Sequence, residues 1–247
     1  MTGRRIGLAR VLSKLGYCSR SQAFTLVRAG KVAINGNVTR NPESPVNETK
    51  DRVTVQGRLI EPSDKVYLLL NKPRGIVTTA SDEKGRDTIY SLLPPDLPWL
   101  APVGRLDKAS EGLLLLTNDS EWAAAITAPE SHLDKTYHVQ IATVADESFL
   151  GKIAAGVRHG DELLRVKRAS ILRGGEKNTW LEIVLDEGRN RHIRRIFDAL
   201  GIEVLRLVRV SIGSIELGTL PKGQTRRLAM AEKDSIDVQL FAPRQRR

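Results

Sequence analysis

One aspartate, Asp107, has the position that most directly suggests chemistry. It lies in the stretch GRLDKASEGLLLLTND, residues 104–119, just before a run of four leucines. An aspartate with an ordinary pKa near ~3.9 is ionised at pH 7, so it can act as a nucleophile or as a base. The plain alternative is a loop aspartate that stabilises a turn before the apolar strand that Gly112 begins.

Other kinds of catalytic centre find little support in the sequence. Cys18 is the single cysteine, which excludes an internal disulfide and a zinc site built from cysteines. The four histidines show no HExxH spacing, and neither a phosphate-binding loop nor a dinucleotide-binding fingerprint is present. We therefore expect no metal and no cofactor.

The positive charge is concentrated near the start of the chain. Residues 1–60 contain eleven Lys/Arg and three Asp/Glu, whereas the formal net charge of the whole chain is +10. A net charge of +8 in a quarter of the sequence is typical of a surface that binds a polyanion, most plausibly nucleic acid. The alternative is a solvated basic surface.

The elements expected in this basic part form a small domain, residues 1–62. Helices are expected at 6–16 and 19–30, a hairpin at 31–39 around Asn35-Gly36, and a short strand pair at 52–60 with Gly57 at its turn. The segment LARVLSKLGYCSRSQAFTLVRAGKVAINGNVT resembles the RNA-binding module of small-subunit ribosomal protein four. That resemblance implies binding to structured RNA. The candidate phosphate contacts are Arg10, Lys14, Arg20, Arg28 and Lys31.

The second part, residues 63–240, reads as strands with interspersed helices. Strands are expected at 66–72, 75–79, 112–117, 135–142, 162–172, 179–188 and 203–217, and helices at 120–129, 145–157 and 189–201. Strict alternation of strand and helix is missing, which favours an α+β domain with a mixed, largely antiparallel sheet. Residues 241–247 are expected to be a disordered basic tail.

The stretch around Asp107 follows a long signature: Gly-Arg-Leu-Asp, then Ser and Gly, four apolar residues and Thr. It resembles the pseudouridine synthases of ribosomal RNA, the RsuA/RluB type. The words NKPRGIVTT, KTYHV, EGRNRHIRRIFDALG and LPKGQTRRL resemble further segments of that family in the right order, so the resemblance covers the whole chain. One departure is His192, where many relatives have Gln; its role stays open.

The resemblance implies roles for individual residues. Asp107 is the catalytic carboxylate, Tyr137 stacks on the target base and helps to remove its proton, Arg194 is the basic partner, and Ile193 lies beneath the tyrosine. Since an arginine within roughly 4–6 Å favours an ionised carboxylate even in a dry pocket, we expect a buried Asp107–Arg194 ion pair. The alternatives are that Tyr137 is an ordinary half-buried residue of a strand and that Arg194 is a surface arginine.

Two further cations have open roles. Arg105 precedes Asp107 by two residues. It either occupies the position in the base stack that a flipped uridine leaves, binds a phosphate of the RNA, or is a solvated loop residue. Lys72 is either another RNA phosphate contact or a charge at the end of a strand.

Together these observations predict an enzyme that isomerises uridine to pseudouridine in ribosomal RNA, with the large subunit favoured over the small one because of the segment 188–201 and the charged tail. Its partner would be the RNA, a ribosomal subunit or an assembly intermediate, and we expect a cytoplasmic monomer without a membrane segment. The alternatives are a non-catalytic RNA-binding assembly factor on the same scaffold, which would not need Asp107, and a small-molecule enzyme such as a hydrolase, which the basic first domain disfavours.

Overall fold

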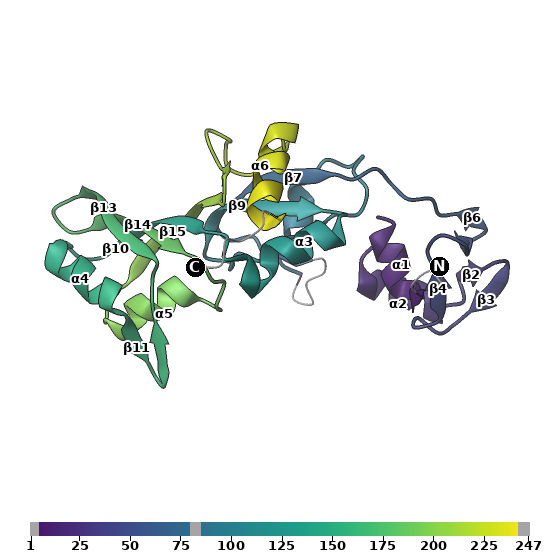
Figure 1. The fold of residues 1–247 in the computed structure, drawn as a ribbon, viewed down its shortest axis with the longest axis horizontal. Coiled ribbons are helices and arrows are strands. Elements are labelled where there is room, and N and C mark those ends of the chain that lie inside the picture. Colours follow the sequence, from purple (N-terminus) through teal and green to yellow (C-terminus); the bar gives the residue numbers. More distant parts are fainter. Residues whose placement is uncertain (1–4, 80–84, 242–247) are drawn as a thin grey trace. The chain divides into compact units, whose positions relative to one another are not determined.

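The computed structural model describes residues 5–79 and 85–241 (Figure 1). The chain forms two compact units. The first contains the chain up to Tyr67 together with Leu93–Ala101 and Leu116–Glu121, and the second contains Leu68–Leu92, Pro102–Leu115 and the chain from Trp122 onward. The domain boundaries expected from the sequence, after 62 and after 240, remain predictions.

The first unit packs two helices, α1 (Leu8–Lys14) and α2 (Arg20–Arg28), against short strands. A four-stranded antiparallel sheet has the order β3-β2-β5-β6, and a separate pair joins β1 to β4. The strand bounds are β1 (Arg5–Gly7), β2 (Val32–Ile34), β3 (Asn37–Thr39), β4 (Pro45–Asn47), β5 (Val53–Val55) and β6 (Arg58–Leu59).

Local sequence signals explain these elements. Ser19 caps α2: its hydroxyl accepts from the amide of Gln22 at 3.1 Å, and the Gln22 side chain accepts in return from the Ser19 amide at 2.9 Å. The expected hairpin turn is present, since both Asn35 and Gly36 have positive φ. The first helix was expected to include Ile6, but that residue belongs to β1 and pairs with Val46, so the helix begins only after Gly7.

Asn118 connects segments of the first unit that are far apart in sequence. Its side chain accepts from the amide of Val66 at 2.9 Å and donates to Ser63 Oγ and to the carbonyl of Asp64 at 2.9 and 2.8 Å. The Ser63 hydroxyl in turn donates to the carbonyl of Leu15 at 3.1 Å. A buried amide that satisfies three partners fixes the local geometry more firmly than an apolar contact would.

The second unit is built on a mixed sheet with the strand order β13-β14-β10-β15-β9-β7-β17, with β16 added to β15 and β8 to β9. The pairs β10–β14, β10–β15, β13–β14, β15–β16 and β7–β17 are antiparallel, and β9–β15 is parallel. This confirms the predicted α+β class with a largely antiparallel sheet. The bounds are β7 (Tyr67–Lys72), β8 (Ala101–Pro102), β9 (Glu111–Thr117), β10 (Lys135–Ile141), β13 (Arg168–Gly174), β14 (Thr179–Leu185), β15 (Val204–Ile212), β16 (Ile215–Glu216) and β17 (Thr225–Arg227).

Among the described residues from 67 to 241, four α-helices and two short 3₁₀ helices accompany this sheet. The α-helices are α3 (Ser120–Thr127), α4 (Glu147–Ala155), α5 (His192–Ala199) and α6 (Met230–Phe241), and the 3₁₀ helices are η1 (Ile89–Leu92) and η2 (Pro129–Ser131). A separate hairpin pairs β11 (Val157–His159) with β12 (Glu162–Leu164). In Figure 1, α4 and α5 lie beside the strands β13, β14, β10 and β15. Val139, Leu181 and Leu207 from these strands share a core with Phe197 of α5.

The central strand β9 is buried along its whole length, as its run of leucines predicts. At Gly112 the backbone of β9 comes very close to that of β15. A Cβ at this position would lie 2.2 Å from the carbonyl oxygen of Arg209, and Gly112 has φ +101°. Only glycine fits this close approach of the two parallel strands. The position directly follows the loop that carries Asp107.

Several expected elements were wrong in detail. Residues 75–79 form no strand but a single bridge between Val77 and Thr88, and the strand expected at 162–172 is divided between β12 and β13. Helix α6 was not expected from the sequence. It includes Phe241, the first residue of the expected tail, and the rest of that tail lies outside the described residues. Within residues 5–79 and 85–241, no helix is long and apolar enough to cross a membrane.

Candidate active site

Asp107 lies in the loop between β8 and β9 and lines a cavity of about 630 Å³ in the second unit. The cavity is also lined by Tyr137 from β10, by the segment 185–193 that leads into α5, and by Arg209 from β15. The Asp107 side chain is 33 % exposed. The sheet and α5 thus bring segments about a hundred residues apart to one carboxylate that a substrate can reach.

The loop of Asp107 is held through its backbone. Each carbonyl oxygen from residue 107 to residue 110 accepts a hydrogen bond. Lys72 Nζ donates to the carbonyls of Asp107 and Ser110 at 3.2 and 2.9 Å, the amide of Gly75 donates to Lys108 at 2.8 Å, and Arg194 Nη2 donates to Ala109 at 3.0 Å. We call this set of contacts the carbonyl clamp.

Lys72 is fully buried, at 0 % exposure, and its third hydrogen bond goes to the carbonyl of Pro73 at 3.1 Å. A phosphate contact, one of the two roles considered from the sequence, is therefore wrong, because the ammonium group cannot reach an RNA backbone. Burial lowers the pKa of Lys72 to about 8, although the charges of Asp107 and Glu111 oppose the shift. At pH 7 the group is still mainly charged and can donate all three bonds.

The expected buried ion pair between Asp107 and Arg194 is not what the structure contains. Asp107 Oδ2 lies 3.8 Å from Nη1 of Arg191, and Arg194 donates to the backbone of the same loop. Arg191 is the N-cap of α5 with φ 49° and lines the cavity, whereas Arg194 lies one turn further along the helix. Burial, and then the charge of Arg191, lower the pKa of Arg194, while Asp107 opposes this. Arg194 is thus near the carboxylate but acts on its loop.

Tyr137 and Ile193 border the same apolar core and line the same cavity, and the position of Ile193 beneath the ring stays a prediction. Ile193 is buried at 3 % exposure, and the half-buried ring of Tyr137 packs against the same apolar cluster. Tyr137 also lines the cavity that contains Asp107. A half-buried aromatic ring that lines a cavity is suited to stacking on a base.

His192 is buried at 3 % exposure beside Glu187, whose Oε1 lies 3.6 Å from Nδ1. Burial is the main cause that lowers the pKa of His192, so the ring is neutral at pH 7. Arg105 is exposed at the edge of the cavity, as a contact to RNA outside the cavity requires.

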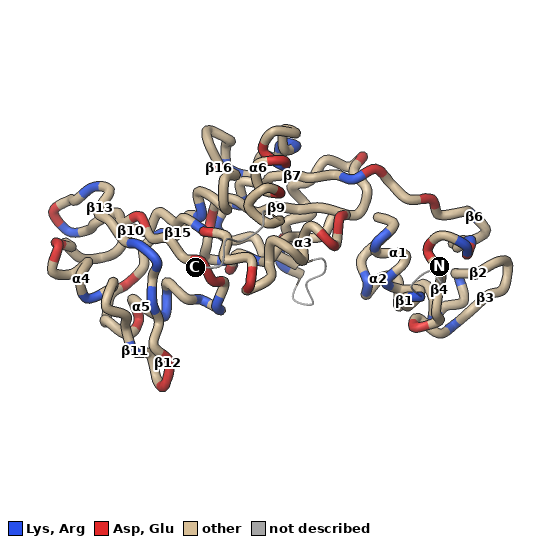
Figure 2. Tube along the Cα trace, in the orientation of Figure 1, with Lys and Arg blue, Asp and Glu red and all other residues tan. Residues whose placement is uncertain are grey.

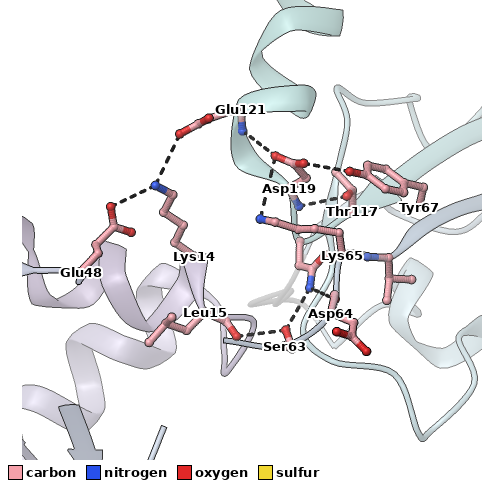
Figure 3. Close-up of polar contacts among 12 residues, drawn as sticks. Lys14, Leu15, Glu48, Ser63, Asp64, Lys65, Tyr67, Thr117, Asp119 and Glu121 are labelled. Carbon is pink, nitrogen blue, oxygen red and sulfur yellow. Dashed lines mark hydrogen bonds and ion pairs between the residues drawn. The ribbon is translucent and has the colours of Figure 1, made fainter. Parts of the chain in front are cut away.

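In the first unit, four of the five candidate phosphate contacts are exposed: Arg10, Arg20, Arg28 and Lys31. Figure 2 shows basic positions on α1 and α2, which contain three of these residues. Lys14 differs, because its ammonium group pairs with Glu48 at 3.1 Å and with Glu121 at 3.5 Å, as Figure 3 shows. Its proposed phosphate contact is therefore disfavoured, since two carboxylates of the same unit already bind the charge.

Among the arginines and lysines that line the cavity, sequence reasoning gave no role to Lys135, Arg189, Arg191 and Arg209. For Arg209 the available signal was a second arginine in the largely apolar segment VLRLVRVSI. Among the described residues, no three His, Cys, Asp or Glu side chains form a group that could hold a metal ion.

Comparison with known proteins agrees with this geometry. Residues 66–199 match the profile of the family described as RNA pseudouridylate synthase, and residues 6–53 match the S4 domain. The chain is 34 % identical over 227 residues to the ribosomal large subunit pseudouridine synthase B of Bacillus subtilis, covering 91 % of this chain and 93 % of that protein. It is 36 % identical to an uncharacterized RNA pseudouridine synthase of Aquifex aeolicus, covering 98 % and 99 %. A crystal structure of a pseudouridylate synthase superposes with a TM-score of 0.65 at 30 % identity, over 94 % of this chain and 99 % of that one.

Proposed function

The chain belongs to the RNA pseudouridylate synthase family, and on that premise we propose that it converts a uridine of ribosomal RNA, in the large subunit rather than the small, into pseudouridine. The relatives named as acting on the large subunit, in Bacillus subtilis and Haemophilus influenzae, support this choice of RNA. So does the basic first unit, which contains the S4 domain. The proposal includes a monomeric enzyme that works in the cytoplasm.

The reaction has no net addition or loss of atoms. The bond between N1 of the base and C1′ of the ribose breaks, and its electron pair goes to the base. The base turns within the cavity, C5 forms a new bond to C1′, the proton on C5 leaves, and N1 takes up a proton. The chain's own residues must therefore hold an extruded nucleotide, engage the ribose and move one proton.

Asp107 is the residue that engages the ribose. The observation that carries this assignment is the carbonyl clamp, because it fixes the loop of an accessible carboxylate through four backbone hydrogen bonds. A nucleophile or base that is held in place loses little entropy at the transition state. Nη1 of Arg191 lies 3.8 Å from Asp107 Oδ2, so a fixed positive charge faces the carboxylate in the cavity.

Tyr137 contacts the base, and Arg105 contacts the surrounding RNA. The ring of Tyr137 stacks on the extruded uracil, and its hydroxyl takes part in removal of the proton from C5. Arg105, exposed at the edge of the cavity, contacts the RNA around the extruded nucleotide. The exposed arginines of α1 and α2 bind phosphates of the surrounding structured RNA.

The test is Asp107→Asn, which keeps the shape of the side chain and removes its charge. We expect no pseudouridine in ribosomal RNA by carbodiimide treatment and primer extension, with RNA affinity almost unchanged. Asp234→Asn on the exposed surface of α6 is the matched control and should retain full activity. Normal pseudouridine formation by the Asp107 variant would exclude the assigned role. RNA binding without pseudouridine formation by the wild type would instead favour a non-catalytic assembly factor.

A further inference from the structure

Two basic side chains that line the cavity, Lys135 and Arg209, are withdrawn from solvent and have no part in the function proposed above. Lys135 is the first residue of β10, and Arg209 lies on β15. Arg209 is 6 % exposed, and Lys135 is half-buried. A cation taken out of water costs free energy unless something compensates it, so two in one cavity require an explanation.

The strand pairing places both cations beside Tyr137. Lys135 and Tyr137 are two residues apart on β10, so their side chains lie on the same face of the sheet. Tyr137 and Arg209 are direct cross-strand partners in the antiparallel pair β10–β15, which also places them on one face. Burial and then the charge of Arg209 lower the pKa of Lys135, as expected of two neighbouring cations.

Arg209 is fixed in position but incompletely bonded. Its Nε donates to the carbonyl of Leu113 at 2.8 Å, next to the close backbone crossing at Gly112. Its Nη2 is buried and has no hydrogen-bond partner among residues 5–79 and 85–241. A buried donor without a partner is unfavourable, and such a group in a cavity is typical of a site that a ligand completes.

The acidic groups near Lys135 do not pair with it. Asp134 and Asp186 raise its pKa through their charges, but in the described part of the chain neither carboxylate forms an ion pair with its ammonium group. Asp134 pairs with Lys167, and Asp186 lies beside His132. Lys135 is thus free to bind an acceptor in the cavity.

We propose that Lys135 and Arg209 bind the uracil ring of the extruded nucleotide and stabilise the negative charge that its oxygen atoms gain when the bond between N1 and C1′ breaks. This rests on the proposed function and adds two residues to its machinery. When that bond breaks, the electron pair passes to N1 and is shared with O2 and O4. Negative charge therefore develops on the uracil ring, and hydrogen-bond donors that are fixed beside the ring lower the barrier to cleavage of the N1–C1′ bond.

A phosphate is the other anion that two cations could bind, and burial argues against it. The backbone phosphates of RNA stay outside the cavity when a base enters it. Arg105 is exposed and the Arg191 side chain is 47 % exposed, so these residues suit phosphates. Arg209, at 6 % exposure, suits the inserted base.

The experiment compares Lys135→Gln with the wild type in single-turnover reactions at saturating enzyme. The substrates are in vitro transcripts of large-subunit ribosomal RNA that contain either uridine or 5-fluorouridine, and loss of the target nucleoside is followed by nuclease digestion and mass spectrometry. Fluorine withdraws electrons and makes the departing base a more stable anion. Lys135→Arg keeps the charge, and Lys152→Gln on the exposed side of α4 is the matched control.

We expect Lys135→Gln to slow the uridine reaction by about 10²-fold, as loss of a donor to a developing charge does. The loss with 5-fluorouridine should be several-fold smaller, while Lys135→Arg retains most of the rate and Lys152→Gln all of it. Equal losses on both substrates would overturn the inference and leave the proposed function intact, as would an unchanged rate with weaker RNA binding. If the wild type forms no pseudouridine, the proposed function fails and this inference fails with it.

Discussion

Replacing Lys72 with methionine separates the carbonyl clamp from general stability. The substitution keeps the length of the side chain and removes the donor of three hydrogen bonds. The carbonyl of Asp107 still accepts from the amide of Ser110 at 3.0 Å, so only the carbonyls of Pro73 and Ser110 are left without a donor from the described residues. Each such loss costs about 1–3 kcal/mol.

Removal of a buried charge acts in the opposite direction. A fall in the pKa of Lys72 from 10.5 to about 8 corresponds to roughly 3 kcal/mol that the charged form loses on burial. The two effects nearly cancel, and we expect the free energy of unfolding to fall by only about 1 kcal/mol. The melting temperature should then fall by about 2–4 °C.

Catalysis should suffer far more than stability. Without Lys72 the Asp107 loop can shift, and a displacement of about 1 Å costs on the order of 10²-fold in rate. Single-turnover pseudouridine formation and differential scanning calorimetry on the same preparation measure the two effects. Lys177→Met, at an exposed position, is the control. A rate within a few-fold of the wild type would refute the carbonyl clamp, and a weaker salt dependence of RNA binding would restore Lys72 as a phosphate contact.

Further predictions concern pH, backbone geometry and helix capping. Because the unfolded chain keeps the Lys72 proton up to pH 10.5 whereas the folded chain releases it near pH 8, the stability of the wild type relative to Lys72→Met should be constant below pH 7. It should rise by up to about 3 kcal/mol between pH 8 and 10.5 in urea unfolding, and a flat difference would contradict the lowered pKa. Gly112→Ala should destabilise by more than about 3 kcal/mol, because its Cβ would overlap the Arg209 backbone at a positive φ. Gly151→Ala, with open space on α4, should not destabilise, and equal urea midpoints for these two variants would argue against the close crossing. Ser19→Ala should cost about 1 kcal/mol by loss of the cap of α2, measured by thermal unfolding, and no change would show that the cap contributes nothing.

Local signals in the sequence determined many of the elements. The cap at Ser19, the turn at Asn35-Gly36 and the leucine run of β9 each act within a few residues, so propensity and periodicity sufficed to predict them. The bridge at Val77 and the helix α6 were missed. The bridge depends on a distant partner, and the sequence offered no strong local signal for the helix.

The candidate site shows the same division. The GRLD segment indicated Asp107 as a candidate site residue, and the KTY and HIRR segments indicated Tyr137, Ile193 and Arg194. A sequence signature preserves residue types and spacing, so these candidates could be named without a structure. Which atoms meet was decided only in three dimensions. The Asp107 carboxylate lies beside Arg191, the N-cap residue of α5, whereas Arg194 donates to the backbone of the Asp107 loop.

Tertiary structure alone also decided the roles of the buried cations. Nothing in the neighbours of Lys72 along the chain shows that it donates to carbonyls 35 and 38 residues away. Nor does the sequence show that the pairing of β10 with β15 places Arg209 opposite Tyr137. The sequence determined which groups are available and where strands and turns begin. Burial and long-range strand pairing depend on the packing of the whole domain. They decided which charged side chains line the cavity and which donate hydrogen bonds to the loops around it.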